Sequence, residues 1–466
     1  MEFSQIKNIC CIGAGYVGGP TMAVIADKCP SLNVTVVDIN KERINKWNEE
    51  NIDKLPVYEP GLAEIIKRCR NRNLFFSIDI KKNIQVADLI FLSVNTPIKK
   101  SGLGKGQASD LKYIESSTRE IAKYATGETI IVEKSTLPVR TAETIKSILK
   151  SNSQLNNNQK FSVLSNPEFL AEGTAIDDLE NPDRVLIGGE NMEAISVLEE
   201  IYLNWVEKHK IIKTNLWSSE LSKLVANAFL AQRISSINSI SAICETTGAD
   251  INEVSSAIGM DSRIGGKFLN AGPGYGGSCF KKDILNLVYL SKYYGLNEVA
   301  SYWQKVVDLN FWQQHRISKI IVNKLFNNLT GKKIGILGFS FKANTNDTRE
   351  SPSIQICKDL IEEGANLRIY DPKVNNIQIE NDLGQKQFTD DDGSWISCES
   401  AIDAAKEADA IVIATEWKEF KSLDWSQISS LMRSPKWLFD TRGVTNSCDL
   451  KNCDINYWKI GLGDSS

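Results

Sequence analysis

Short apolar runs alternate with stretches of helical periodicity along the first third of the chain. Residues 7–12, 33–37, 87–94 and 129–134 have the length and the aliphatic, β-branched content of strands. Residues 20–26, which lie between the first two runs, predict a helix. The nearly continuous apolar character of residues 87–94 indicates a strand that is buried on both faces. This alternation predicts an α/β fold with a parallel sheet.

The middle of the chain favours long helices. Residues 218–258 contain few helix breakers and place apolar side chains at helical spacing. This pattern predicts one long helix with a break near Thr247 and Gly248. Two more helices are expected, from Asp283 into the low 290s and over residues 298–325. The asparagine-rich residues 151–160 are expected to form a surface loop.

The C-terminal third repeats the opening pattern. Residues 333–338, 367–370 and 408–414 predict strands, and glycines remain at 335 and 338 although the GxGxxG pattern is absent. We therefore expect an α/β protein with two Rossmann-like, doubly wound domains joined by a long central helix. A fortuitous likeness between two α/β halves is the alternative.

A chain of 466 residues has room for roughly two to four domains. We expect three. Residues 1–213 form a nucleotide-binding Rossmann domain, residues 214–325 a helical linker, and residues 326–466 a second Rossmann-like domain.

The composition bears on which partners the protein could bind and on the cellular compartment in which it could function. A net charge of −4 gives no strongly basic surface, so we expect no nucleic-acid partner, and anionic ligands must be met by local groups. Ten cysteines without a CxxC pair indicate reduced thiols. His209 and His315 are the only histidines, so a His-based zinc site or a Ser-His-Asp triad is not expected. We find no signal-like N-terminus or bilayer-length apolar run, and expect a soluble cytoplasmic protein with no metal and no membrane partner.

A glycine-rich turn follows the first predicted strand. Gly13, Gly15 and Gly18 form a GxGxxG pattern that opens a helix, and Asp38 ends the second strand twenty residues after Gly18. This order of strand, turn, helix, strand and acidic residue is typical of a dinucleotide-binding βαβ unit. The Asp38 carboxylate would accept from the ribose hydroxyls and repel a 2′-phosphate, which favours NAD over NADP. The alternative is that Asp38 is only a turn residue.

Hydroxyl-bearing loops follow two further strands. Asn95-Thr-Pro97 comes after residues 87–94, and Ser135-Thr136-Leu-Pro138 comes after residues 129–134. Ligands of doubly wound sheets collect at the carboxyl ends of the strands, so these loops are expected to line the cofactor crevice.

A lone cysteine closes a second glycine-rich segment. Cys279 follows Gly272-Pro-Gly-Tyr-Gly-Gly-Ser, and Asp283 lies one helical turn beyond it. A thiol near lysines and a helix N-terminus can act as a thiolate nucleophile, although a buried structural thiol is the commoner fate. Lys223 and Asn227 share the same four-residue spacing on the predicted long helix. For Lys223 the alternative is a solvated charge.

The cofactor turn and the cysteine together indicate a specific chemistry. Hydride transfer to a nicotinamide needs a base but no nucleophile. A thiolate becomes useful when an aldehyde is oxidised to an acid, because it adds to the carbonyl and leaves a thioester after hydride loss. The pair therefore predicts four-electron oxidation of an alcohol to a carboxylate.

Six motifs occur in order along nearly the whole chain. They are GAGYVGGP at 13–20, VNTP at 94–97, EKST at 133–136, NPEFLAEG at 166–173, GGSC at 276–279 and DTRES at 347–351. In this combination the sequence resembles the UDP-glucose/GDP-mannose dehydrogenase family of nucleotide-sugar 6-dehydrogenases. Residues 268–272 and 279–283 resemble the eukaryotic UDP-glucose branch more than the GDP-mannose branch.

The resemblance implies a role for each reactive residue. Cys279 matches the nucleophile, and Lys223 matches the lysine that holds the developing oxyanion and takes part in proton transfer. Asp283 matches the aspartate that assists deprotonation with an ordered water. Glu168 matches the carboxylate that activates water for thioester hydrolysis, with Thr136 helping to place that water. The resemblance also puts Asn227 beside Lys223, on the oxyanion.

The resemblance further implies two sets of binding residues. NAD contacts are implied for Gly13, Ala14, Gly15, Tyr16, Val17, Gly18, Asp38, Arg43, Val94, Asn95, Thr96, Pro97, Ser135, Glu172 and Arg349. Contacts to the UDP-sugar are implied for Phe169, Leu170, Ala171, Glu172, Lys223, Asn227, Arg263, Phe268, Asn270, Gly272, Tyr275, Gly276, Phe341, Lys342 and Arg442. Arg263 resembles an arginine that reaches across from a neighbouring subunit. Lys342 and Arg442 would supply local positive charge, and the substrate would bridge the two halves.

The implied activity is oxidation of UDP-glucose to UDP-glucuronate by two NAD⁺. The resemblance also implies a homodimer formed through the central helical region, with dimers assembling to a hexamer. Two alternatives stay open, a GDP-mannose or UDP-N-acetyl-sugar 6-dehydrogenase and an inactive NAD- and UDP-sugar-binding regulator. Asn270 stands where some animal members carry lysine, so one ligand contact is expected to differ. The chain ends soon after Trp458, so we expect none of the behaviour that depends on the long polar tail of some animal members.

Overall fold

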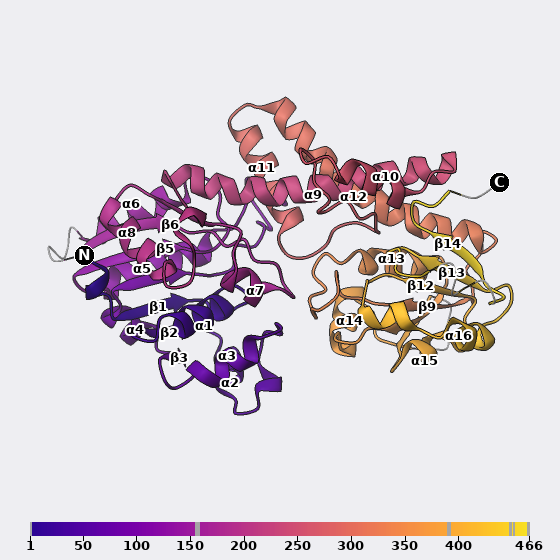
Figure 1. Ribbon diagram of the computed structural model, residues 1–466, viewed down its shortest axis with the longest axis horizontal. Coiled ribbons are helices and arrows are strands. Elements are labelled where there is room, and N and C mark those ends of the chain that lie inside the picture. The colour runs from indigo at the N-terminus through magenta and orange to yellow at the C-terminus, as the bar shows by residue number, and fades with distance from the viewer. Residues whose placement is uncertain (1, 154–158, 389–392, 447–449, 451–452, 464–466) are drawn as a thin grey trace. The chain divides into compact units, whose positions relative to one another are not determined.

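The computed structural model describes residues 2–153, 159–388, 393–446, 450 and 453–463 (Figure 1). The chain divides into two compact units, Met1–Ala226 and Asn227–Ser466. Each unit contains one sheet with helices on both of its faces, so the expected α/β class with two doubly wound sheets is confirmed. The division into three domains stays a prediction. Within the described ranges, no helix is both long enough and apolar enough to cross a membrane.

The first unit is built on an eight-stranded sheet with the order β3-β2-β1-β4-β5-β6-β7-β8. Neighbouring strands are parallel except β6 and β7, which run antiparallel and pair Leu164 with Gly189. The strands are β1 (Asn8–Ile12), β2 (Asn33–Val37), β3 (Leu74–Ser77), β4 (Leu89–Leu92), β5 (Glu128–Glu133), β6 (Lys160–Ser165), β7 (Val185–Gly189) and β8 (Ile211–Thr214). The helices are α1 (Gly18–Lys28), α2 (Lys41–Asn48), α3 (Leu62–Cys69), α4 (Ile80–Val86), α5 (Lys112–Tyr124), α6 (Thr141–Ser153), α7 (Ala175–Glu180) and α8 (Met192–Tyr202).

Strand β1 shows why the first sheet is covered on both faces. Ile9 and Cys11 belong to one apolar cluster, which includes α1 and α8. Cys10 and Ile12 belong to a second cluster, which includes α5 and α6. Alternate side chains of a strand point to opposite faces, so a continuous apolar run fills two cores.

The expected surface loop at residues 151–160 is only partly observed. Residues 151–153 continue helix α6 and Lys160 begins strand β6, so the expectation was wrong at both ends. Residues 154–158 lie outside the described residues.

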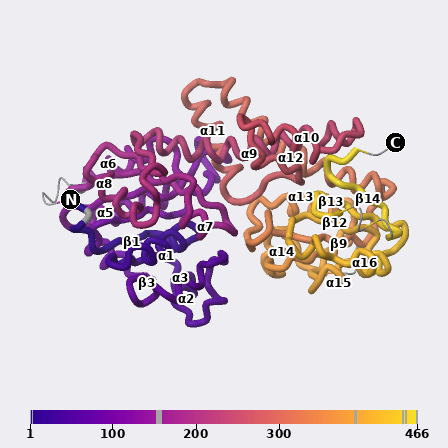
Figure 2. The backbone as a smooth tube through the Cα atoms, in the orientation of Figure 1, coloured from indigo at the N-terminus to yellow at the C-terminus, as the bar shows by residue number. Residues whose placement is uncertain are grey.

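A long helix, α9 (Leu216–Thr247), contains the boundary between the two units. It ends where Gly248 adopts φ +80°, a conformation that glycine reaches without strain, so the break expected there is confirmed. Helix α10 (Ile251–Gly259) follows. Helices α11 (Phe280–Tyr293) and α12 (Asn297–Lys324) then pack against each other as a hairpin (Figure 2).

The sheet of the second unit has six parallel strands in the order β11-β10-β9-β12-β13-β14. These are β9 (Lys333–Leu337), β10 (Asn366–Tyr370), β11 (Trp395–Ser397), β12 (Ala410–Ile413), β13 (Trp437–Asp440) and β14 (Asn456–Lys459). The helices that cover it include α13 (Pro352–Glu362), α14 (Asn376–Leu383), α15 (Ala401–Ala405) and α16 (Trp425–Leu431). Short 3-10 helices are η1 (Phe3–Gln5), η2 (Ile52–Lys54), η3 (Lys208–Lys210) and η4 (Lys418–Ser422).

The turn after β9 explains why the second Rossmann pattern is degenerate. Asp371 follows β10, and its carboxylate accepts from the backbone N–H of Phe339 at 2.7 Å and of Ser340 at 3.0 Å. The acidic residue of this βαβ unit therefore binds the backbone of the turn after β9. Its Oδ2 also accepts from the indole N–H of Trp417 at 3.2 Å.

Candidate functional site

The glycine turn after β1 has the shape that a pyrophosphate requires. Gly13 adopts φ +114°, and a Cβ there would lie 2.2 Å from the carbonyl oxygen of Ser93. A Cβ on Gly18 would lie 2.0 Å from the carbonyl oxygen of Gly13. Gly15 differs, because a Cβ there would meet nothing within 4 Å. Open space at the middle glycine, beside the N-terminus of α1, is what a dinucleotide phosphate would fill, so the turn fits NAD.

Asp38 is buried at the end of β2, with 8% of its surface exposed. Its carboxylate accepts from the backbone N–H of Ala14 at 2.9 Å and of Asn40 at 2.8 Å. The guanidinium of Arg43 donates to it at 3.0 Å. A carboxylate offers about four acceptor positions, so about one remains for a ribose hydroxyl. Arg43, also expected at the cofactor, is thus oriented by Asp38.

The loops after β4 and β5 are tied to each other. The Ser135 hydroxyl donates to the carbonyl oxygen of Val94 at 2.7 Å, and the Thr96 hydroxyl donates to that of Thr136 at 3.1 Å. Strand order reverses between β1 and β4, and both loops lie at carboxyl ends next to that point. Doubly wound sheets bind their ligands there, so the structure brings these loops and the glycine turn to one edge of the sheet.

Glu168 and Lys223 form a buried ion pair. The Nζ of Lys223, on α9, lies 3.2 Å from each carboxylate oxygen of Glu168, and the two side chains are 5% and 6% exposed. Lys223 is therefore not a solvated charge. Separating the two partners would leave a buried charge without its counter-charge and would lower the stability of the fold. The ion pair therefore fixes both groups relative to each other.

The segment that carries Glu168 is held at both ends. At its start, the buried Asn166 accepts from Lys134 Nζ at 3.0 Å and from the hydroxyl of Tyr202 at 2.6 Å. Near its end, the carboxylate of Glu59 accepts from the backbone N–H of Gly173 at 2.8 Å. Phe169, Leu170 and Glu172 are half-buried in this segment, and Ala171 is exposed.

A pair of buried carboxyl groups lies in the same unit, between β5 and α9. Glu133 and Glu220 are 1% and 3% exposed. Glu220 accepts from the backbone N–H of Arg140 at 2.7 Å and of Ala142 at 2.9 Å. No described donor reaches the Glu133 carboxyl, whose neighbour is the Glu220 carboxyl. Burial disfavours ionisation of both carboxyl groups, and the charge of Glu220 disfavours ionisation of Glu133 further, so we infer that the two groups hold one proton between them at neutral pH.

The shared proton predicts a pH-dependent stability. Burial raises the pKa of Glu133 well above its ordinary value of 4.5, the charge of Glu220 raises it further, and Lys146 opposes the shift. Burial also raises the pKa of Glu220, helped by Glu143 and opposed by the two N–H donors. Groups with raised folded-state pKa values stabilise fully below pH 4.5, and the stabilisation is lost as pH rises through the folded pKa.

We therefore expect Glu133→Gln, which keeps the shape without the titration, to gain stability relative to the original chain as pH rises from about 5 to 9. The gain should approach about 1.4 kcal/mol per pH unit while the proton is retained. Urea unfolding at a series of pH values measures it. Glu42→Gln, at a side chain that is 78% exposed, is the matched control. A gain that does not change with pH would contradict the shared proton.

In the second unit, Cys279 stands at the N-terminus of α11. Its carbonyl oxygen accepts from the N–H of Asp283 at 2.9 Å, so the helical turn expected between them is present. The Cys279 Sγ is half-buried, 3.4 Å from the hydroxyl of Ser278. A helix N-terminus favours an anion, which suits a thiolate.

Asp283 is the centre of a buried polar cluster in the second unit. Its carboxylate accepts from Nδ2 of Asn227 at 2.6 Å and lies 3.4 Å from Nζ of Lys282, and its side chain is 2% exposed. Asn227 and Lys223, expected together at the oxyanion, therefore each bind a different carboxylate.

Two glycines of the segment before Cys279 pack closely against Phe341. A Cβ on Gly276 would lie 2.8 Å from Cβ of Phe341, and Gly277 adopts φ +83° with the same ring 3.1 Å away. Both glycines therefore make room for Phe341, and the contact of Gly276 with the UDP-sugar stays a prediction. Asn310 of α12 donates to the carbonyl of Tyr275 at 3.1 Å and accepts from its N–H at 2.8 Å, which fixes the segment.

The two cationic residues expected at the nucleotide, Arg442 and Lys342, differ in their exposure and in their contacts within the protein. Arg442 is 14% exposed and donates to the carbonyls of Ala414 and Phe341 at 2.8 and 3.0 Å. Lys342 is half-buried, with its Nζ 5.5 Å from the ring centre of Phe341. Gly272 lies beside Arg442, since a Cβ there would be 3.6 Å from Nη1.

Arg263 and Arg349 each pair with an aspartate two residues earlier in the sequence. Arg263 is 87% exposed and binds Asp261 at 2.6 Å, and Arg349 is 50% exposed and binds Asp347 at 2.6 Å. Both guanidinium groups are therefore accessible at the surface of the second unit as it stands.

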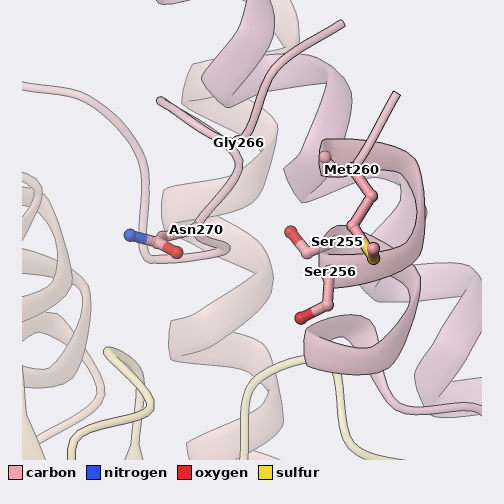
Figure 3. Close-up of a pocket in the computed structure, with 6 residues that line it drawn as sticks. Ser255, Ser256, Met260, Gly266 and Asn270 are labelled. Carbon is pink, nitrogen blue, oxygen red and sulfur yellow. The ribbon is translucent and has the colours of Figure 1, made fainter. Parts of the chain in front are cut away.

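Asn270 lines a cavity of about 230 Å³ with Ser255, Ser256, Gly259, Met260 and Gly266. Figure 3 shows its amide oxygen on the side of the α10 helix that carries the two serines, and its amide nitrogen pointing away from that helix. The adjacent Phe268 adopts φ +63° and is 40% exposed. The amide thus stands at the edge of a small polar hollow.

The expected reactive residues fall into two groups. Thr136, Glu168 and Lys223 lie in the first unit, and the structure joins Glu168 to Lys223. Asn227, Cys279 and Asp283 lie in the second, and the structure joins Asn227 to Asp283.

Several residues at these clusters were not expected from the sequence. Glu59, Lys134 and the Glu133–Glu220 pair are all remote in sequence from the groups that they contact. An unusual polar residue inside an apolar strand, as at Glu133, was the one available signal.

Comparison with known proteins places the chain in a family. The NAD binding, central and UDP binding domains of the UDP-glucose/GDP-mannose dehydrogenase family match residues 7–206, 217–312 and 335–447. A UDP-glucose 6-dehydrogenase of Caenorhabditis elegans is 56% identical over 98% of this chain and 96% of its own length. UDP-glucose 6-dehydrogenase 4 of Arabidopsis thaliana is 54% identical over 97% of both chains. The structure of a UDP-glucose dehydrogenase from Pyrobaculum islandicum matches with a TM-score of 0.84 and 28% identity, over 99% of this chain and 98% of that one. The chain belongs to the UDP-glucose/GDP-mannose dehydrogenase family.

Proposed function

We propose that the chain oxidises C6 of UDP-glucose to the carboxylate of UDP-glucuronate in two NAD-dependent steps. The observation that carries the proposal is Cys279 at the N-terminus of α11, one turn before the buried Asp283–Asn227 pair. An alcohol dehydrogenase that stops at the aldehyde has no use for that thiol. The relatives named UDP-glucose 6-dehydrogenase support the choice of sugar nucleotide.

In the first oxidation the C6 hydroxyl loses a proton and its carbon loses a hydride. Asp283 assists the proton's departure through a water, and Lys223 and Asn227 stabilise the oxygen as charge develops on it. NAD⁺, when bound, takes up the hydride of each oxidation. The segment Gly13–Gly18, Asp38, Arg43 and the loops at Val94–Pro97 and Ser135 would hold it, together with Glu172 and Arg349.

The second oxidation uses the thiol. The Cys279 sulfur adds to the aldehyde carbon, and loss of hydride from the thiohemiacetal leaves a thioester. Water then forms a C–O bond to that carbon, the C–S bond breaks, and Cys279 recovers its thiolate. Glu168 accepts one proton from the water, with Thr136 helping to orient it.

We further propose a cytoplasmic homo-oligomer, dimers that assemble to a hexamer. The support for a reducing compartment is that no disulfide joins any of the nine cysteines in the described part of the chain. The proposal of an oligomer is supported only by the resemblance to the family.

Two NADH are expected for each UDP-glucose consumed, because both electron pairs leave before the product does. Progress curves that follow NADH by absorbance and the sugar nucleotides by chromatography measure the ratio. One NADH per sugar with free aldehyde would refute the thioester route.

A panel of substrates separates this activity from its nearest alternatives. We expect kcat/KM to be highest for UDP-glucose among UDP-glucose, GDP-mannose and UDP-N-acetyl sugars. A higher value for GDP-mannose would overturn the assignment of the sugar nucleotide. Binding of NAD and UDP-glucose without any turnover would instead support a regulator.

A further inference from the structure

The antiparallel junction between β6 and β7 brings a basic residue to the segment that carries Glu168. The register pairs Leu164 with Gly189 and Ser165 with Gly188. If this pairing register is extended past the end of β6, Phe169 lies opposite Arg184. The amide of Asn166 donates to the carbonyl of Leu186 in β7 at 2.8 Å, so the two segments stay in contact just beyond the end of β6.

Arg184 stacks on Phe169. Its guanidinium carbon lies 3.8 Å from the centre of the Phe169 ring. The Nζ of Lys223, which binds Glu168, lies 5.4 Å from the same ring centre. A planar guanidinium covers an aromatic face as an ammonium cannot, so the ring is held by Arg184 and shared with the Glu168–Lys223 pair.

The partial burial of the Arg184 guanidinium carries a desolvation cost in the free energy of folding. Arg184 is half-buried, and within the described residues its guanidinium has no hydrogen bond or ion pair. Burial lowers the pKa of Arg184, with Asp183 opposing the shift. Removing a cation from water without an acceptor costs stability, and residues that break such rules cluster at functional sites.

We propose that Arg184 is a positioning residue that fixes the ring of Phe169, and through the adjoining backbone Glu168, for hydrolysis of the thioester. This rests on the proposed function. In that step water bonds to the acyl carbon, the bond to the Cys279 sulfur breaks, and Glu168 takes a proton. A misplaced Glu168 slows this step far more than the two preceding hydride losses, in which Glu168 takes no proton.

The test is a single-turnover experiment on the full chain with UDP-glucose and excess NAD⁺. In Arg184→Met we expect a burst of two NADH per active site, then acid release about 10- to 100-fold slower than in the original chain. Intact-mass measurement after acid quench should show one acyl adduct per chain on Cys279. Tm should stay within about 3 °C, since no hydrogen bond is lost.

Two further variants test the route through Phe169. The double variant Arg184→Met/Phe169→Leu should release acid no more than twofold slower than Phe169→Leu alone. Arg184→Lys, which keeps the charge without the planar stack, should still accumulate adduct. Multiplicative slowing in the double variant, or full rescue by lysine, would overturn the proposal.

Arg119→Met, at an α5 side chain that is 65% exposed, removes one positive charge as a control and should behave like the original chain. If Arg184→Met slows the NADH burst and acid release equally, with no added adduct, the positioning role fails. If the original chain yields one NADH per sugar, the proposed function itself fails.

Discussion

Replacing Cys279 with alanine is expected to lower UDP-glucuronate formation by roughly a thousandfold or more, while UDP-glucose still binds. In the proposed route the sulfur supplies the covalent bond of the second oxidation, and an alanine side chain cannot form that bond. The side chain makes no capping hydrogen bond to α11, so the helix should persist without it. Chromatography of the products and titration calorimetry with UDP-glucose measure the two effects.

The matched control for this substitution is Cys453→Ala, because Cys453 is the other half-buried cysteine among those described. It should leave turnover unchanged. Normal acid formation by Cys279→Ala would make Cys279 a structural thiol. Loss of UDP-glucose binding in Cys279→Ala would mean that the thiol contributes mainly to the ground state rather than to the chemistry.

Replacing Lys223 with methionine is expected to impair both stability and catalysis. It leaves the Glu168 carboxylate buried without its partner, which should lower the free energy of unfolding by about 3–5 kcal/mol. It also removes the donor that we propose for the developing oxyanion, which should lower kcat by about 10²- to 10³-fold. Urea unfolding and steady-state kinetics measure these losses separately.

A double variant separates the two losses. Lys223→Met/Glu168→Gln removes both charges, so most of the lost stability should return while activity stays lost. Lys46→Met breaks an exposed helix pair with Glu42 and should cost no more than about 0.5 kcal/mol. If Lys223→Met were as stable as Lys46→Met, the ion pair with Glu168 would not be the strong contact described here.

Local patterns were sufficient to predict the elements that carry the reactive groups. The turn at Gly13–Gly18, the length and break of α9, and the helical turn from Cys279 to Asp283 each depend on residues close in sequence. The polar loop expected at residues 151–160 failed because α6 continues through Ser153, where composition alone favoured a turn.

Contacts between distant segments could not be predicted in the same way. Arg184 meets Phe169 only because β7 runs antiparallel to β6, and a sheet predicted to be parallel gives no reason to pair them. The pairing of Glu168 with Lys223 likewise depends on where α9 passes, and Lys223 alone had a plausible solvated alternative. The close approach of Phe341 to Gly276 and Gly277 could not be predicted either, because Phe341 is remote from both glycines in sequence.

Helix α9 carries Glu220, Lys223 and Asn227 within two turns, and the boundary between the two units falls just before Asn227. Each residue inserted in a helix rotates everything beyond it by about 100°. The stretch from 220 to 227 therefore tolerates no change in length, whatever its sequence. Chimeras made with a relative should remain active when the crossover preserves this spacing, and insertion libraries should return no active clone from these eight positions.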